Sequence, residues 1–136
     1  RDSSCMAVCH EKYYSIGMTK VDTILLTLPY PPSVNTYWGF QGHRRFLTTK
    51  AVQFKKEVAR KVSLIPNKFG NERLEVFITL NPPDKRTRDI DNIAKPTLDA
   101  LVSAGLFIDD GQIDRLVIVR SNTVKGGLMT VGVGKL

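Results

Sequence analysis

The chain has little cysteine and no long apolar run. Its two cysteines, Cys5 and Cys9, lie together near the N-terminus and cannot build the disulfide framework of a small secreted protein. No apolar stretch approaches the about 20 residues of a membrane-spanning helix, and no secretory signal peptide is visible. We therefore expect a cytoplasmic protein without a membrane partner.

Several catalytic motifs are also missing. The sequence has no glycine-rich phosphate loop of a nucleotide-binding protein and no Ser-His-Asp or Cys-His arrangement. Cys5, Cys9 and His10 resemble half a zinc site, but a second pair of ligands is lacking, so we assign no zinc to them. We accordingly expect no small-molecule cofactor.

Acidic residues are fewer than basic ones. The 136 residues include 20 Lys and Arg but 13 Asp and Glu, which gives a net charge of +7. Such a surplus favours a polyanionic partner, most often nucleic acid. The length predicts one domain. Residues 1–20 show no periodicity, and we expect them to be a tail, disordered or not native to the protein, before a domain of residues 21–136.

The apolar pattern of this domain predicts the element order β-α-β-α-β-β. Gly105 ends the second helix, and Pro96 requires that helix to begin near Ile93 or to kink there. Gly126 and Gly127 fit a β-hairpin between the last two strands. We thus expect a single α+β domain with a mixed β-sheet and two main helices. The predicted strands are residues 24–28, 74–80, 116–120 and 128–133, and the predicted helices are 49–65 and 92–104.

A proline-rich segment follows the first strand. We expect an extended, turn-rich loop that runs past Tyr37 and Trp38 to a basic turn at residues 42–45. Tyr37, Trp38 and Phe40 could stack on a splayed base, but we expect at least one of them to pack into the core. Residues 44–61 then carry seven basic side chains against Glu57. The simpler interpretation of that segment is a solvated helix face.

Asp89 and Asp91 are the first candidate site residues. Residues two apart in an extended backbone point the same way, and two adjacent carboxylates repel unless a cation lies between them. Mg²⁺ takes carboxylate oxygens and keeps several waters, so it suits such a pair. The alternative is structural: Asp91 caps the helix while Asp89 pairs with Arg86 or Arg88.

Asp109 and Asp110 follow the second helix, which could bring a third carboxylate back to the first pair. Their alternative is a plain surface turn. Lys95, at the start of that helix, could contact a phosphate or stabilise charge in a transition state. Alternatively it forms an i,i+4 pair with Asp99.

Together these motifs resemble the RusA family of Holliday junction resolvases, small endonucleases of bacteria and their phages. The resemblance spans residues 23–133. The matching segments are residues 28–35 (LPYPPSVN), 83–92 (PDKRTRDIDN), Lys95, 99–101 (DAL), 109–110 (DD) and 125–127 (KGG).

The resemblance implies that Asp89, Asp91 and Asp110 bind catalytic Mg²⁺, for which Mn²⁺ can substitute, and that Lys95 assists catalysis. It leaves the role of Asp109 open. It also implies a homodimer that nicks two opposed strands of a four-way junction in DNA recombination and repair. The residues expected to neutralise DNA phosphates are Arg44, Arg45, Lys55, Lys56, Arg60, Arg86 and Arg88.

Two other functions are compatible with a basic domain. One is a junction- or duplex-binding protein without catalytic activity, and the other is an RNA-binding module that stacks bases on its aromatic loop. The presence of Asp89, Asp91, Asp110 and Lys95 together favours the enzyme.

Overall fold

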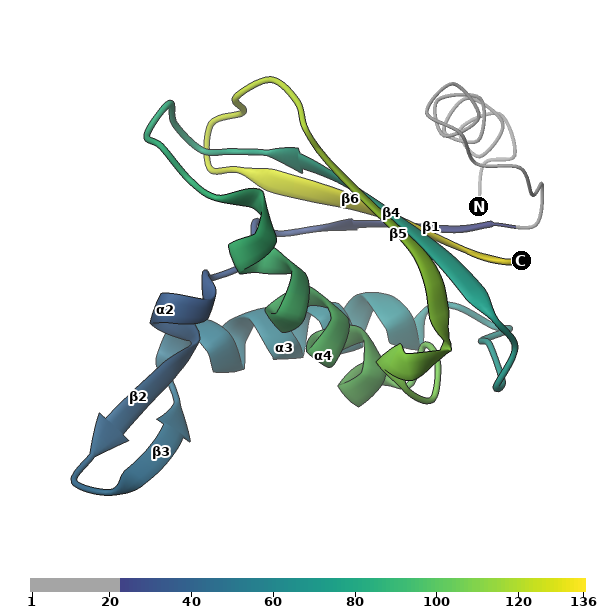
Figure 1. Ribbon diagram of the computed structural model, residues 1–136, viewed down its shortest axis with the longest axis horizontal. Helices are drawn as coiled ribbons and strands as arrows, with labels where there is room; N and C mark the ends of the chain where they lie inside the picture. The colour runs from purple at the N-terminus through teal and green to yellow at the C-terminus, as the bar shows by residue number, and fades with distance from the viewer. Residues whose placement is uncertain (1–22) are drawn as a thin grey trace.

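The computed structural model describes residues 23–136, so the expected tail, with Cys5, Cys9 and His10, lies outside the described residues. The described residues form one α+β domain. A four-stranded sheet carries two helices on one face, and a two-stranded hairpin projects from one end (Figure 1). The predicted fold class is confirmed.

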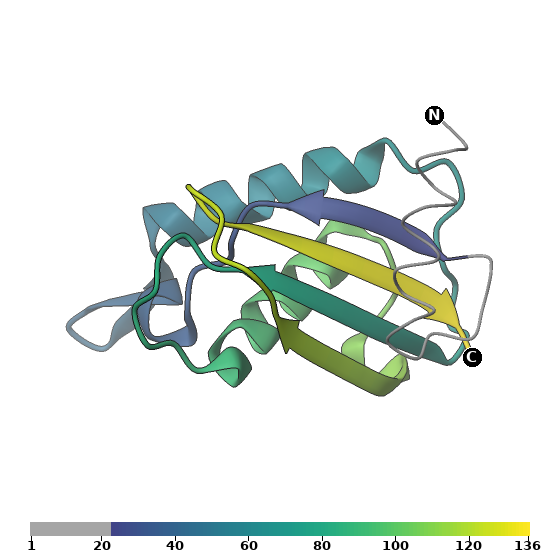
Figure 2. The same cartoon turned by 90° about the horizontal axis from the view of Figure 1, so that it is seen from above.

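The large sheet has the strand order β1-β6-β4-β5 (Figure 2). Strand β4 lies parallel to β5 and antiparallel to β6, and β6 lies antiparallel to β1. The sheet is therefore mixed, as the sequence predicted. Its strands are β1 (Ile24–Leu28), β4 (Leu74–Asn81), β5 (Ile113–Arg120) and β6 (Leu128–Lys135).

The predicted hairpin between β5 and β6 is wrong, because β4 lies between these two strands. The turn itself is present, since Gly126 and Gly127 have φ angles of 82° and 72°. It belongs to a longer connection that crosses the end of β4, where the Ser121 amide donates to the Leu80 carbonyl. Turn residues report local backbone conformation, but they do not specify which strands pair.

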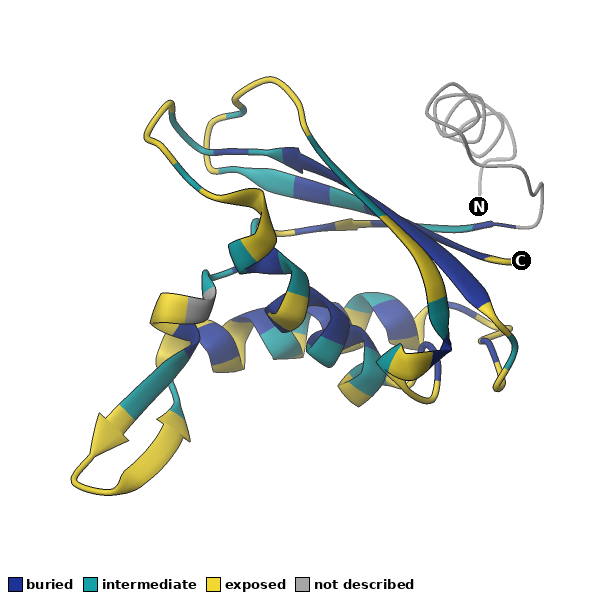
Figure 3. Cartoon of the chain, viewed as in Figure 1, coloured by how far each residue is buried: buried dark blue, intermediate teal, exposed yellow. Residues whose placement is uncertain are grey.

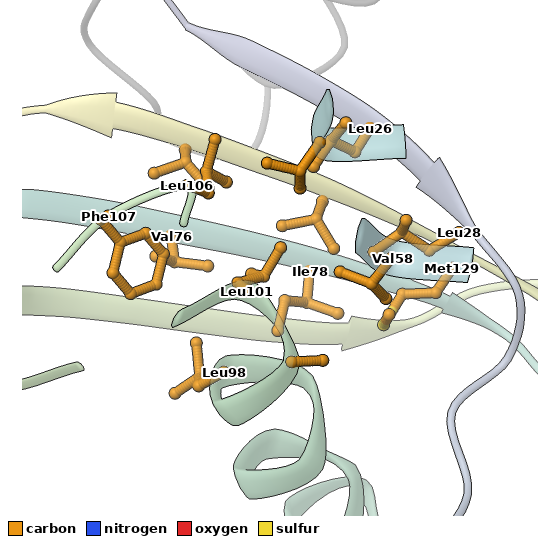
Figure 4. Close-up of a cluster of buried hydrophobic side chains, with 14 of the residues drawn as sticks. Leu26, Leu28, Val58, Val76, Ile78, Leu98, Leu101, Leu106, Phe107 and Met129 are labelled. Atoms are coloured by element: carbon orange, nitrogen blue, oxygen red, sulfur yellow. The ribbon is translucent and has the colours of Figure 1, made fainter. Parts of the chain in front are cut away.

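The core lies between the sheet and the helices α3 (Thr49–Ser63) and α4 (Ala94–Ala104). Figure 4 shows Val76 and Ile78 of the inner strand β4 beside Leu98 and Leu101 of α4. Every residue from 74 to 80 is buried, which makes β4 the most buried strand of the sheet. No helix among residues 23–136 is long and apolar enough to cross a membrane.

The helix ends follow the sequence signals. The hydroxyl of Thr48 accepts a hydrogen bond from the Ala51 amide at the start of α3, at 3.3 Å. A short 3₁₀ turn, η1 (Ile90–Ile93), precedes α4, so Pro96 lies in the first α-helical turn, where its missing N–H is not needed. Gly105 ends α4 with a left-handed φ of 86°.

The expected loop after β1 is more ordered than predicted. It contains a short helix, α2 (Val34–Tyr37), and a hairpin of β2 (Trp38–Gln41) and β3 (Arg44–Leu47). Gly42 provides the positive φ of the hairpin turn, at 62°. Strands of four residues are too short to establish an alternating pattern, which is why the sequence did not reveal them.

The two glycines after β5 offer a matched test of the connection. The Cβ of alanine at Gly126 would meet open space, so the left-handed φ is the only source of strain. Gly126→Ala should therefore lower the free energy of unfolding by about 1 kcal/mol. Alanine at Gly127 adds a Cβ only 2.8 Å from Tyr30 Cβ and 3.1 Å from Pro83 Cδ, so Gly127→Ala should cost clearly more. Urea unfolding of both variants measures the difference. Equal losses in the two variants would show that Tyr30 and Pro83 move aside for the added Cβ at no measurable cost.

Candidate active site

Asp89 and Asp91 lie where the connection from β4 turns into α4. Asp89 is the last extended residue before η1, and Asp91 lies within η1, so they do not share the extended backbone that the sequence suggested. Asp89 is the cap residue and makes no side-chain capping bond, so the alternative in which Asp91 caps the helix is wrong. Both residues are exposed, and neither carboxylate has a hydrogen-bonding or ionic partner within residues 23–136.

The neighbouring arginines bind Asp84 instead. Arg88 Nη1 lies 2.7 Å from Asp84 Oδ1, and Arg86 Nε lies 3.4 Å from the same oxygen. The hydrogen bond from Arg88 holds the pKa of the Asp84 carboxyl well below its usual range. The alternative in which Asp89 pairs with Arg86 or Arg88 is therefore wrong, and the negative charge of Asp89 is not neutralised by these side chains.

Lys95 connects two carboxylates. Its Nζ lies 3.1 Å from Asp110 Oδ2 and 3.1 Å from Asp99 Oδ1. The i,i+4 pair with Asp99 is thus present, but the lysine also reaches the turn after α4. Hydrogen bonds to Asp110 and then Asp99 raise the pKa of Lys95, so the side chain stays protonated at neutral pH.

Asp109 and Asp110 have different surroundings, although they are adjacent. The Asp109 carboxylate accepts a hydrogen bond from the Gly111 amide at 3.0 Å and caps the short helix η2 (Asp110–Gln112). The surface-turn interpretation therefore describes Asp109, whereas the carboxylate of Asp110 contacts Lys95.

Gln112 holds this turn and was missed in the sequence. It is only 6% exposed, and its Oε1 accepts hydrogen bonds from the amides of Ile108 and Asp109 at 2.7 and 2.9 Å. Its Nε2 donates to the carbonyls of Gly70 and Glu72 at 2.9 and 2.7 Å. The signal that could have revealed it is the spacing of Asp109 and Gln112, which matches a capping box.

The three expected metal ligands do not form one group. Within residues 23–136, no three Asp, Glu, His or Cys side chains lie close enough to hold a metal ion. The turn after α4 brings Asp110 back to Lys95 at the start of that helix, and not to Asp89 and Asp91. Mg²⁺ needs only one or two carboxylates besides water and phosphate oxygens. The carboxylates of Asp89 and Asp91 are exposed and are ligands of the type that this ion prefers, and their binding of it stays a prediction.

Two clefts border the segment from Asp89 to Asp99. The larger has a volume of about 850 Å³, and residues of the proline-rich loop line it together with Lys50, Asp89 and Asn92. The smaller, of about 280 Å³, contains Lys95 and Asp110 beside Lys55. Acidic and basic side chains thus meet in both clefts, an arrangement suited to a phosphate and a cation together.

The residues expected to contact DNA differ in accessibility. Arg44, Arg45, Lys56, Arg60 and Arg86 are exposed, whereas Lys55 and Arg88 are half-buried in the smaller and the larger cleft, respectively. Arg60 is engaged in an ion pair with Glu57 at 2.7 Å. Arg86 and Arg88 also pair with Asp84, so the predicted cations that are exposed and lie outside the ion pairs found among residues 23–136 are Arg44, Arg45 and Lys56.

Over most of its length the chain is similar in sequence to known endodeoxyribonucleases. Residues 29–131 match the family model of endodeoxyribonuclease RusA. The chain is 36% identical over 110 residues to the crossover junction endodeoxyribonuclease rusA of Enterobacteria phage HK97, an alignment that covers 80% of this chain and 92% of the relative. It is 30% identical over 117 residues to the protein of the same name from Escherichia coli K12, covering 85% and 98%.

The geometry around Gln112 predicts a cost when its amide is removed. Gln112→Ala deletes four partly buried hydrogen bonds to backbone groups, which should lower the free energy of unfolding by about 2–4 kcal/mol. Gln112→Glu keeps an oxygen that accepts from the amides of Ile108 and Asp109. Its second oxygen replaces the Nε2 donor, so a carboxylate then faces the carbonyls of Gly70 and Glu72. Urea unfolding of both variants tests this, and a loss below about 1 kcal/mol for Gln112→Ala would contradict a structural role for the amide.

Proposed function

The chain belongs to the RusA family of endodeoxyribonucleases, and on this premise we propose that it resolves Holliday junctions. As a homodimer it nicks two opposed strands of a four-way DNA junction, by Mg²⁺-dependent hydrolysis, in DNA recombination and repair. The observation that carries this proposal is the segment from Asp89 to Asp99. It combines two carboxylates lacking a partner among the described residues with a lysine bound to Asp110, between two clefts that contain basic side chains.

The acidic side chains supply the ligands for the metal ion. Asp89, Asp91 and Asp110 would supply carboxylate oxygens to Mg²⁺, or to Mn²⁺ in its place, and Asp110 also pairs with Lys95. When bound, the ion activates a water and stabilises charge on the leaving oxygen. Carboxylates that lack a protein counter-ion suit this role, because the ion then replaces repulsion with attraction.

Lys95 provides the positive charge that stays in the site without a metal. Its ammonium group is protonated at neutral pH and is oriented by Asp99 and Asp110. A scissile phosphate beside it would gain a fixed cation where negative charge develops in the transition state.

Sequence-independent affinity for DNA comes from the basic surface, since cations that contact phosphates release counter-ions. A folded chain of this size has a radius of gyration of about 14 Å, which is too small to hold two separated active sites. Paired nicks at two-fold-related phosphates therefore require two copies of the chain. Because the relatives come from bacteria and phages, we place its action in the bacterial cytoplasm.

A nicking assay on a synthetic four-way junction tests this function. We expect paired symmetric nicks with Mg²⁺, none with EDTA, and little cleavage of linear duplex or flap controls. Tight junction binding without cleavage in any divalent metal would instead support the non-catalytic DNA-binding protein.

Variants in the same assay separate catalysis from binding. Asp89→Asn should abolish cleavage while junction binding persists, because it removes a proposed metal ligand and reduces negative charge near DNA. Asp114→Asn is the matched control, since Asp114 is also exposed but pairs with Arg73 elsewhere on the surface. Loss of binding together with cleavage in Asp89→Asn would show that Asp89 is structural.

Salt dependence tests the basic surface. A plot of log K for the junction against log[salt] should fall with a slope of about −0.9 for each phosphate neutralised. Lys56→Ala should reduce the steepness by about 1. Lys68→Ala should leave it unchanged, because Lys68 lies beyond the far end of α3 and its Nζ donates to the Ile65 carbonyl. A flat salt response of the wild-type protein would contradict the basic-surface argument.

A further inference from the structure

The hairpin of β2 and β3, residues 38–47, is an arm that extends away from the body of the domain (Figure 3). Its side chains are largely exposed, and they include two phenylalanines. Phe40 is 71% exposed and Phe46 is 43% exposed. An isolated hairpin gains little from folding in water, so exposed rings on one indicate a binding element.

The two faces of the arm are both organised around aromatic rings. Trp38, Phe40 and Arg45 share one face, because Phe40 pairs with Arg45 and alternate residues point the same way. The Arg45 guanidinium lies over the Trp38 ring, 3.8 Å from its centroid. On the other face the Phe46 ring covers Gly39, where an added Cβ would approach within 2.5 Å of it. Packing therefore positions Trp38, Arg45 and Phe46 and leaves the ring of Phe40 presented to solvent.

The charge around the arm selects the kind of partner. Residues 29–56 contain six basic or histidine side chains and no Asp or Glu. An exposed ring on a segment whose charged side chains are all basic complements a polyanion that also offers flat apolar surfaces, and nucleic-acid bases next to phosphates have both properties.

The root of the arm adjoins the candidate active site. Trp38 and Leu47 line the smaller cleft, which also contains Lys95 and Asp110. DNA held in that cleft would therefore meet the arm within a few nucleotides. A two-stranded ribbon is narrow enough to enter a DNA groove, and apolar side chains can unstack base steps.

We propose that this arm inserts into the junction and that Phe40 stacks on a base near the phosphate bound beside Lys95. The stacked ring holds the branch point open, while Arg44 and Arg45 contact flanking phosphates. This inference rests on the proposed function and adds to it the element that distorts the DNA.

Fluorescence of 2-aminopurine at the branch point of a synthetic four-way junction tests the inference. In EDTA, the wild-type protein should raise the fluorescence by unstacking the probe. Phe40→Ala should abolish the rise and weaken junction binding about tenfold, whereas Phe40→Trp should retain both. Leu64→Ala is the matched control, because Leu64 is 70% exposed and lies beyond the far end of α3.

The outcomes separate this inference from the proposed function. A wild-type protein that does not nick the junction in Mg²⁺ contradicts the proposed function, and with it the stacking role. A wild-type protein that nicks, combined with Phe40→Ala that binds, unstacks and nicks equally well, contradicts only the inference. If sedimentation shows that Phe40→Ala converts a dimer into monomers, the arm joins two copies of the chain and the stacking proposal is wrong.

Discussion

Strands β4 and β5 lie side by side in the same direction, and such a pair can be joined only by a crossover that returns the chain along the sheet. Helix α4 is that crossover, and its apolar face packs on β4. The acidic motifs occupy the two connections of this crossover, one before α4 and one after it. The pairing of β4 with β5 thus places the two acidic motifs at the two ends of α4, and the second of them brings Asp110 to Lys95. A change that loosened the parallel pair would displace both motifs.

The two acidic motifs are held in different ways. The turn that carries Asp110 is fixed by Gln112, which connects it to the chain just before β4. The segment that carries Asp89 and Asp91 follows a loop in which Asp84 binds the neighbouring arginines. One motif therefore has a rigid support and a lysine as counter-ion, whereas the other presents carboxylates without a counter-ion among the described residues. This asymmetry suits a site in which an incoming cation is bound first by the open pair.

The sequence was informative wherever a local rule decides the structure. Proline at position 96 and glycine at 105 specified where α4 begins and ends, and the alternation of residues 74–80 identified the central strand. The order of the strands was not predictable, because the glycines after β5 specify a turn but not the strand beside it. The partners of Arg88 and Lys95 depended on which loops the fold brings together. The Asp-x-Asp and Asp-Asp motifs could be identified as a candidate site, but their separation in space could not.

The arm is attached to the domain at its root and contributes little to the core (Figure 3). Its residues are therefore under weaker packing constraint than those of the sheet. Substitutions, insertions or a change in length at the tip can alter the surface that meets a partner without a loss of fold stability. Divergence among proteins of this architecture should accordingly concentrate in the arm, which lets one catalytic scaffold acquire new target preferences in small, individually tolerated steps.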